Sequence, residues 1–170
     1  MGLFSSSEKY NSLECLFRDQ LQDVYDAENQ LLDALPRMAE AATAEDLKSA
    51  FRNHLTETEK QIERLEKVFG SMKEAPKRKT CDAMKGLLSE GNDAINAKGS
   101  DEVRDAALIC AAQRVEHYEI AVYGCLRNLA SHLGMDASIG LLQTTLDEEG
   151  AADKALTSLA ETGINAAAAS

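Results

Sequence analysis

Hydrophobic residues recur along most of the chain with the three- and four-residue spacing of helices. Four long helices are predicted, over about residues 10–42, 45–69, 100–133 and 136–161. Ala, Leu, Glu, Lys and Gln dominate these segments, and β-branched runs that would favour strands are absent from the sequence. The pattern therefore predicts an all-α fold.

The stretch between the second and third helices, residues 71–99, breaks this pattern. It opens with the basic, proline-containing SMKEAPKRKT and continues with CDAMKGLLSEGNDAI, which favours one or two short helical turns interrupted by Gly86 and Gly91. A link of this length does not suit a tight hairpin but suits the crossover of a four-helix bundle. We therefore predict a ferritin-like four-helix bundle over residues 10–161, a flexible arm at 1–9 and a tail at 162–170.

Proline and glycine set the expected helix ends. Pro36 lies inside the first helical pattern, so that helix either kinks there or ends near Leu35. Gly70 and Gly134 follow the last periodic residues of the second and third helices, and each is expected to end its helix.

Composition narrows the functional classes. A chain of 170 residues suggests one domain, and its formal net charge of −11 argues against nucleic-acid binding and against anionic membranes. Four cysteines lie far apart without a CxxC pair, which predicts reduced, mostly buried thiols in a cytoplasmic protein rather than a zinc–thiolate site. No apolar run approaches the length of a membrane-spanning helix.

The third helix carries the most informative stretch, AALICAAQRVEHYEIAVYGCL at residues 106–126. At about 100° per residue, Glu116 and Glu119 fall on the same broad face as Leu108, Val115 and Tyr123. A buried carboxylate without a partner costs several kcal/mol, so it must be protonated, paired with a cation or bound to a metal ion.

Each of the other long helices also places an acid on or beside its apolar stripe. Two antiparallel helix pairs facing each other would bring these acids together in the middle of the bundle. Several carboxylates so close cannot all ionise without a cation, and hard oxygen ligands suit iron, manganese, magnesium or calcium. The predicted metal ligands are Glu28, Glu57, Glu116, Glu119, Glu149 and Asp153.

Plainer interpretations exist for the individual residues. Glu57 lies about 90° from the centre of its stripe, as expected of a flank residue. His54 suits an interfacial histidine as well as a ligand, and Gln61 is a second polar candidate on the same flank. Tyr123 fits either simple core packing or a hydrogen bond to a ligating carboxylate.

Several segments, in order and with matching spacing, resemble the YciF-like family of ferritin-like bacterial stress proteins. They are DAENQL, HLTETEKQIERLE, CDAMKGLLSEGND, EVRDAALICAAQRVEHYEIAVYG and TLDEEGAADKALTSLA, which span most of residues 11–161. The resemblance implies a four-helix bundle, a homodimer and a centre of two metal ions, without a settled activity. VEHYE is also similar to the third-helix segment of rubrerythrins, which implies ligand roles for Glu116 and Glu119, while DAENQ implies one for Glu28.

One departure from that pattern matters. Rubrerythrins carry Glu-x-x-His on the second and fourth helices, whereas here Lys60 and Ala152 follow Glu57 and Glu149 at that spacing. A site built almost entirely from carboxylates offers hard oxygen ligands, so manganese, magnesium and calcium are candidates as well as iron. Two functions remain open: a di-metal protein of ferroxidase or peroxidase type that handles iron, oxygen or peroxide under stress, and a non-enzymatic stress-induced dimer that acts through protein partners.

Overall fold

The computed structural model describes residues 10–170, so the predicted arm at 1–9 lies outside the described residues. The described chain is helical and contains no strand, which confirms the all-α prediction. The elements are α1 (Leu13–Ala41), α2 (Glu45–Ser71), α3 (Asp82–Ile95), α4 (Asp101–His132), α5 (Asp136–Leu159), a π-helical turn η1 (Ala160–Ile164) and α6 (Asn165–Ala168).

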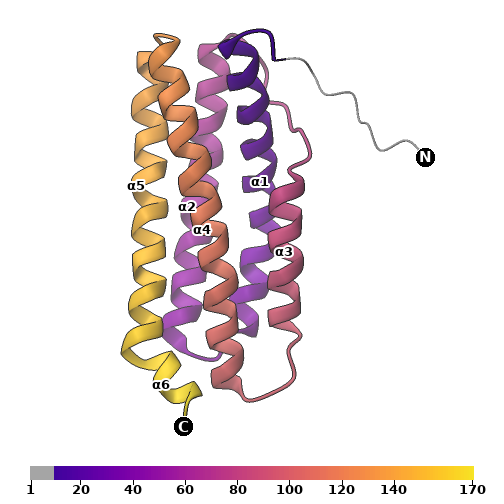
Figure 1. The fold of residues 1–170 in the computed structure, drawn as a ribbon, viewed down its shortest axis with the longest axis vertical. Helices are drawn as coiled ribbons and strands as arrows, with labels where there is room; N and C mark the ends of the chain where they lie inside the picture. The colour runs from indigo at the N-terminus through magenta and orange to yellow at the C-terminus, as the bar shows by residue number, and fades with distance from the viewer. Residues whose placement is uncertain (1–9) are drawn as a thin grey trace, which may run out of the picture.

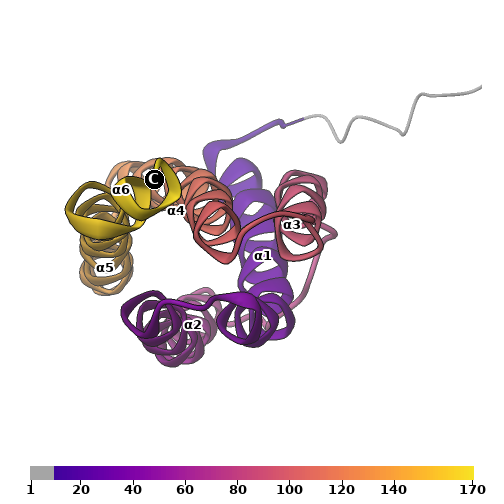
Figure 2. The same ribbon diagram turned by 90° about the horizontal axis from the view of Figure 1, so that it is seen from below.

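Four long helices stand side by side as a bundle (Figure 1). Seen along the bundle in Figure 2, they follow the order α1, α2, α5, α4 around a ring. Each helix runs antiparallel to both of its ring neighbours. The linker after α2 and then α3 return the chain to the other end of the bundle, with α3 packed outside α1 and α4. This is the predicted four-helix bundle with a long crossover.

Helix α1 is continuous through Pro36 and ends at Ala41, so the proline does not end the helix near Leu35. At its start Ser12 caps α1 by accepting a hydrogen bond from the backbone N–H of Cys15. The continuous helix lets the apolar side chains beyond Pro36, including Met38 and Ala39, join the core at the far end of the bundle.

Two helix ends use the same capping geometry. After α4, Gly134 takes a φ of 68°, and the N–H groups of Gly134 and Met135 bond back into the last turn, which confirms the predicted stop. After α2 it is Lys73, with a φ of 60°, that takes this position, while Gly70 lies within the helix. The prediction that Gly70 ends α2 is therefore wrong by two residues, because the left-handed residue comes later.

The crossover segment forms one helix of 14 residues where one or two interrupted turns were expected. Neither Gly86 nor Gly91 breaks α3. Gly91 is buried against α4, where a Cβ atom would come 4.0 Å from that of Ala111. Close contact with α4 stabilises a helix that two glycines alone would disfavour.

The core consists of two apolar clusters separated by a polar layer. One cluster, built around Leu35, Phe51 and Leu108, occupies the end of the bundle where α2 begins. The other, built around Phe17 and Phe69, occupies the opposite end. The polar layer consists of eight buried residues from α1, α2, α4 and α5: Glu28, His54, Thr58, Gln61, Glu116, Glu119, Thr145 and Glu149.

Two expectations about burial need correction. On α2 the buried face includes Leu47, Phe51 and Leu65 together with His54 and Gln61, which were expected at its flank, while Leu55 and Ile62 are only partly buried. The buried face therefore follows an alternating three- and four-residue spacing that is rotated toward His54 and Gln61. All four cysteines are free thiols, but Cys110 and Cys125 are exposed because they lie on the outward face of α4.

The chain after α5 folds back onto the bundle. The turn η1 and helix α6 both contact α4, and Ile164 packs against the apolar cluster at that end. No pattern in the sequence of residues 162–170 predicted this contact.

Candidate metal centre

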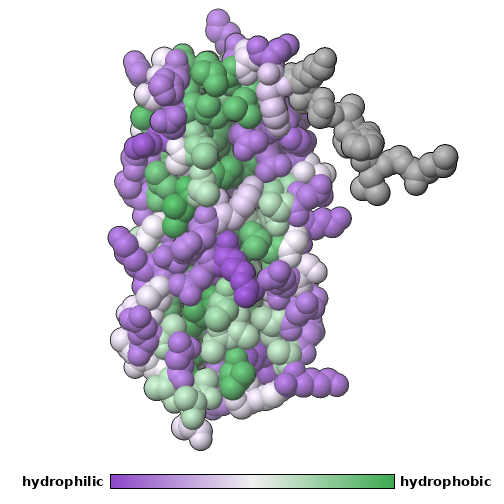
Figure 3. Space-filling view, in the orientation of Figure 1, coloured by the Kyte–Doolittle hydropathy of each residue, from purple (hydrophilic) through white to green (hydrophobic). Residues whose placement is uncertain are grey.

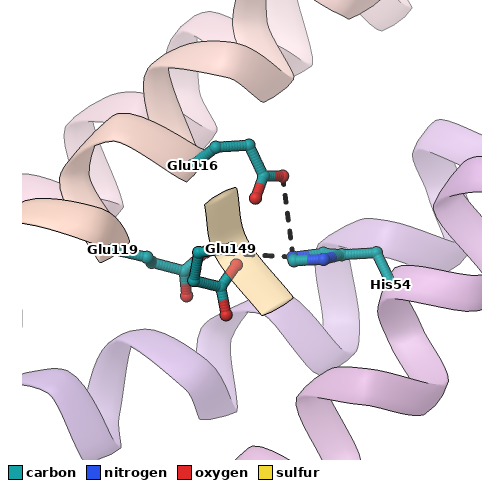
Figure 4. A group of neighbouring side chains, drawn as sticks. All are labelled: His54, Glu116, Glu119 and Glu149. Atoms are coloured by element: carbon teal, nitrogen blue, oxygen red, sulfur yellow. Dashed lines mark ion pairs between the residues drawn. The ribbon is translucent and has the colours of Figure 1, made fainter. Parts of the chain in front are cut away.

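Three helices bring four side chains together in the polar layer. His54 of α2, Glu116 and Glu119 of α4, and Glu149 of α5 each offer a donor atom, and these atoms lie within 4.8 Å of one another. Figure 4 shows the side chains turned toward a common point. His54 Nε2 lies 3.7 Å from Glu116 Oε1 and 3.8 Å from Glu119 Oε2. All four residues are buried.

Simple helix geometry explains the convergence. Glu116 and Glu119 are three residues apart on α4, so both project from one face. His54 lies on the buried seven-residue repeat of α2, and Glu149 lies on the buried stripe of α5 between Thr145 and Leu156. Because α4 and α5 are antiparallel neighbours of each other, as are α2 and α5, these positions meet at mid-length of the bundle.

Helix α1 supplies a fourth carboxyl to the same layer. Glu28 is fully buried and accepts a hydrogen bond from the hydroxyl of Tyr123. Burial raises the pKa of Glu28 well above its usual value, and the nearby Glu149 carboxylate raises it further, while the hydrogen bond from Tyr123 opposes both effects. This tyrosine therefore hydrogen-bonds a candidate ligand, one of the two roles that the sequence left open for it.

A polar network on α2 and α5 orients Glu149. The amide of Gln61 donates to Glu149 Oε1 and, at 3.2 Å, to Glu148 Oε2. Arg64 donates hydrogen bonds from both terminal nitrogens to the same Glu148 carboxylate. Gln61 thus acts as a hydrogen-bond donor to a candidate ligand, and Arg64 places a positive charge beside the acidic layer.

The protonation states follow from burial. Desolvation raises the pKa of Glu116 to about 8 and raises the pKa values of Glu119 and Glu149 well above the usual range, and the neighbouring carboxylates add to the shifts of the last two. Desolvation lowers the pKa of His54 to about 4. At neutral pH the imidazole is therefore neutral, so its contacts with Glu116 and Glu119 are not charged pairs.

The donor atoms fit a metal ion because they lack other partners. Among residues 10–170, both nitrogens of His54, both oxygens of Glu119 and one oxygen each of Glu28, Glu116 and Glu149 are buried without a hydrogen-bond partner. A buried polar atom left unsatisfied costs about 1–3 kcal/mol. An imidazole nitrogen with several carboxylate oxygens is a donor set typical of iron and manganese.

The remaining predicted ligands lie at the edge of this cluster or outside it. Glu57 has a side chain 39% exposed, and its Oε2 lies 3.9 Å from Nδ1 of His54. Asp153 is turned toward α4, where it lies 3.2 Å from His117 Nε2 and accepts a hydrogen bond from Gln113. The structure thus brings together Glu28, Glu116, Glu119 and Glu149, keeps Glu57 at the rim and pairs Asp153 elsewhere.

His54 is the member that sequence reasoning left undecided. Its signal is the seven-residue spacing of His54, Gln61 and Val68, all buried on α2. The more hydrophobic stripe through Leu55 and Ile62 concealed that repeat. The sequence feature that indicates a ligand role for His54 is its place at a buried position of a seven-residue repeat, one turn before Glu57.

Comparisons with known proteins show the family of the chain. Residues 12–169 match the family described as "Domain of unknown function (DUF892)". The chain belongs to this family. The DUF892 chain is also 48% identical over 155 residues to Protein YciF of Escherichia coli (strain K12), a match that covers 91% of this chain and 93% of the relative.

Solved structures of similar proteins share the fold. The crystal structure of the E. coli stress protein YciF superposes on this DUF892 chain with a TM-score of 0.88 at 48% identity, covering 91% of this chain and 98% of that one. YcfI of Rhodopseudomonas palustris, provisionally described as a structural protein, gives a TM-score of 0.86 at 42% identity, covering 89% and 96% of the two chains. A Xanthomonas campestris protein, at 18% identity and a TM-score of 0.71, shares the fold alone.

Among residues 10–170, no helix has the length and apolar character needed to cross a membrane.

Proposed function

We propose that this protein is a stress-linked di-metal carboxylate protein that handles iron, oxygen or peroxide. Iron is the first candidate metal, followed by manganese and then by magnesium or calcium. His54, Glu28, Glu116, Glu119 and Glu149 would hold the metal pair. Two of the predicted ligands are placed less directly, since Glu57 would approach from the rim and Asp153 would have to leave His117.

One observation carries the proposal. Acids from three helices and a neutral imidazole from a fourth converge in a buried layer, and most of their donor atoms lack partners among the described residues. A purely structural layer would satisfy these atoms with one another, as Tyr123 and Gln61 do for one oxygen each of Glu28 and Glu149. The similarity to the E. coli stress protein supports the link to stress.

A bound pair of iron or manganese ions would supply redox chemistry toward oxygen or peroxide. The protein would contribute binding and orientation. The two apolar clusters flank the layer along the bundle, and the hydrogen bonds from Tyr123 and Gln61 hold Glu28 and Glu149 in place.

Metal titration tests the proposal. The metal-free chain is loaded anaerobically with Fe(II) or Mn(II) and analysed for bound metal. We expect about two ions per chain, as in ferritin-like carboxylate sites, and a loss of at least half of them in Glu149→Gln. The control is Asp147→Asn, an exposed acid on the same helix. Fewer than about one ion per chain, or equal loading of the Glu149→Gln variant, would refute the metal centre.

The alternative is a non-enzymatic dimer that acts through protein partners, and the structural description of YcfI favours it. In that case the buried acids serve only the fold. Glu116→Gln, which removes one crowded carboxyl, would then raise the melting temperature, and added metal would not change it. The homodimer itself remains a prediction, and sedimentation equilibrium of the full chain tests it.

A further inference from the structure

A cavity of about 410 Å³ opens between α2 and α5 and reaches the candidate metal centre. His54 and Glu116 form part of its wall. From there it extends toward the end of the bundle where α2 begins and α5 ends, and Asp46 and Leu159 line that region. The cavity therefore connects solvent with the polar layer along one groove between two helices.

Small side chains on α5 create this space. Ala151, Ala152 and Ala155 line the cavity, and Leu156 completes the same wall. Ala152 lies three residues after Glu149, the position at which the Glu-x-x-His pattern would place a histidine. A small apolar side chain at that position leaves room beside the cluster rather than another ligand.

The walls of the cavity differ in chemistry. The wall on α5 is hydrocarbon along Ala151, Ala152 and Ala155, whereas His54 and Glu116 offer hydrogen-bonding groups. Asp46 and Glu57 add acidic groups, the Glu148 carboxylate is paired with Arg64, and no lysine or arginine is found among the described residues that line the cavity. An acidic rim repels carboxylate ligands and admits uncharged ones. A hydrogen peroxide molecule would use only a small part of such a volume.

We propose that this cavity binds an uncharged organic hydroperoxide, with its peroxide group at His54 and Glu116 and its hydrocarbon part against the alanine wall of α5. This assignment rests on the proposed function and names its substrate class. In the net reaction the O–O bond breaks, two electrons and two protons are taken up, and an alcohol and water form. Two ferrous ions held by the cluster would supply the two electrons, one each, and solvent would supply the two protons.

The first test needs no metal. The metal-free chain, with labelled alanine methyl groups, is titrated with 2-phenyl-2-propanol, the alcohol formed from cumene hydroperoxide. We expect saturable shifts of the Ala152 and Ala155 signals, and about tenfold weaker binding of 2-methyl-2-phenylpropanoate, the analogue that carries a carboxylate. Absence of saturable shifts at these methyl groups, or equal binding of the carboxylate, would refute the proposal.

Two variants narrow the cavity. Ala152→Leu fills it beside the cluster, and Ala155→Leu fills it at an exposed position where a larger side chain does not disturb the fold. We expect each to weaken binding of the alcohol about tenfold or more. Ala137→Leu, at an exposed position on α5 away from the cavity, is the matched control and should bind like the wild type.

The iron-loaded chain gives the second test. Ala155→Leu should slow oxidation of bound Fe(II) by cumene hydroperoxide about tenfold while changing oxidation by hydrogen peroxide less than about twofold. Equal effects on both peroxides would refute the assigned substrate class. Binding of the alcohol without binding of metal would refute the metal centre alone, whereas metal loading without binding of the alcohol would refute the cavity assignment alone.

Discussion

The hydroxyl of Tyr123 on α4 donates a hydrogen bond to the carboxyl of Glu28 on α1, and both side chains are fully buried. The bond joins two residues that are 95 positions apart in sequence, at the boundary between the polar layer and one apolar cluster. It fixes one oxygen of Glu28 and leaves the other without a partner among the described residues. A candidate ligand is thus held in place by a residue that is not a ligand itself.

Replacing Tyr123 with phenylalanine should destabilise the metal-free protein by about 1–3 kcal/mol, because a buried carboxyl loses its donor. Urea unfolding followed by circular dichroism measures the change. Tyr25→Phe is the matched control, since the Tyr25 hydroxyl bonds to Glu66 in an exposed pair, and its loss should cost less than about 0.5 kcal/mol. Equal effects of the two variants would contradict a special role for the buried bond.

The stability of the metal-free protein should fall as the pH rises from about 6.5 to 8. Below the usual carboxyl pKa of 4.5, Glu116 is protonated in both the folded and unfolded states. Above it the unfolded carboxyl ionises, but burial keeps the folded one protonated up to its pKa of about 8, so stabilisation is progressively lost over that range. Each such carboxyl contributes a slope of about −1.4 kcal/mol per pH unit.

His54 sets the lower limit of this window. Its pKa is lowered by burial from 6.5 to about 4, so the unfolded state takes up a proton below pH 6.5 that the folded state rejects. This effect opposes that of the carboxyls below pH 6.5 and is absent above it. Chemical denaturation across this pH range measures the unfolding free energy against pH. Glu116→Gln should make the slope less negative by about 1.4 kcal/mol per pH unit, the contribution of one carboxyl. A flat or rising profile above pH 6.5 in the metal-free chain would contradict the crowded carboxyls.

Removing the imidazole of His54 should weaken metal binding more than removing the carboxylate of Asp153, which lies outside the cluster. We expect His54→Ala to lower the affinity for Mn(II) about tenfold or more, because a buried donor is lost from the centre of the cluster. Asp153→Asn should change it less than about twofold, since Asp153 pairs with His117 and Gln113. Isothermal titration of both variants measures the two affinities. A larger loss in Asp153→Asn would mean that Asp153 turns inward when metal binds.

The fold was predictable because helical periodicity is a local property. The spacing of Leu21, Val24, Glu28 and Leu31 is enough to show which face of α1 is buried. The acids on α4 were predictable for the same reason, since Glu116 and Glu119 lie among apolar residues on a single face.

What could not be predicted depends on how neighbouring helices rotate against each other. His54 is buried because packing against α1 and α5 rotates the buried face of α2 toward His54 and away from Leu55 and Ile62. Asp153 shares a broad face with Glu149, but a rotation of α5 places it near His117 on α4. The rotation of each helix about its axis decides which polar residues meet. It arises from packing between helices rather than from the sequence of one helix.

Asp105 stabilises the connection into α2, a helix whose start has no side-chain cap of its own. The residue before α2 is Ala44, which offers no capping side chain, and the buried carboxylate of Asp105 on α4 accepts bonds from the N–H groups of Thr43 and Ala44 and from the Thr43 hydroxyl. Asp105→Ala should therefore lower the unfolding free energy by about 1–3 kcal/mol, because three donors lose their acceptor.

Thermal and urea unfolding of the metal-free chain measure this effect of the Asp105 carboxylate. The control is Asp101→Ala, which removes an exposed acid from the first turn of the same helix, where it pairs with nearby Arg104 at 2.6 Å. That change should cost less than about 1 kcal/mol. A loss in Asp105→Ala no larger than in Asp101→Ala would show that the α1–α2 connection does not depend on α4 for its stability. The expected difference would instead show that α4, which carries two of the candidate ligands, also holds in place the start of the helix that carries His54.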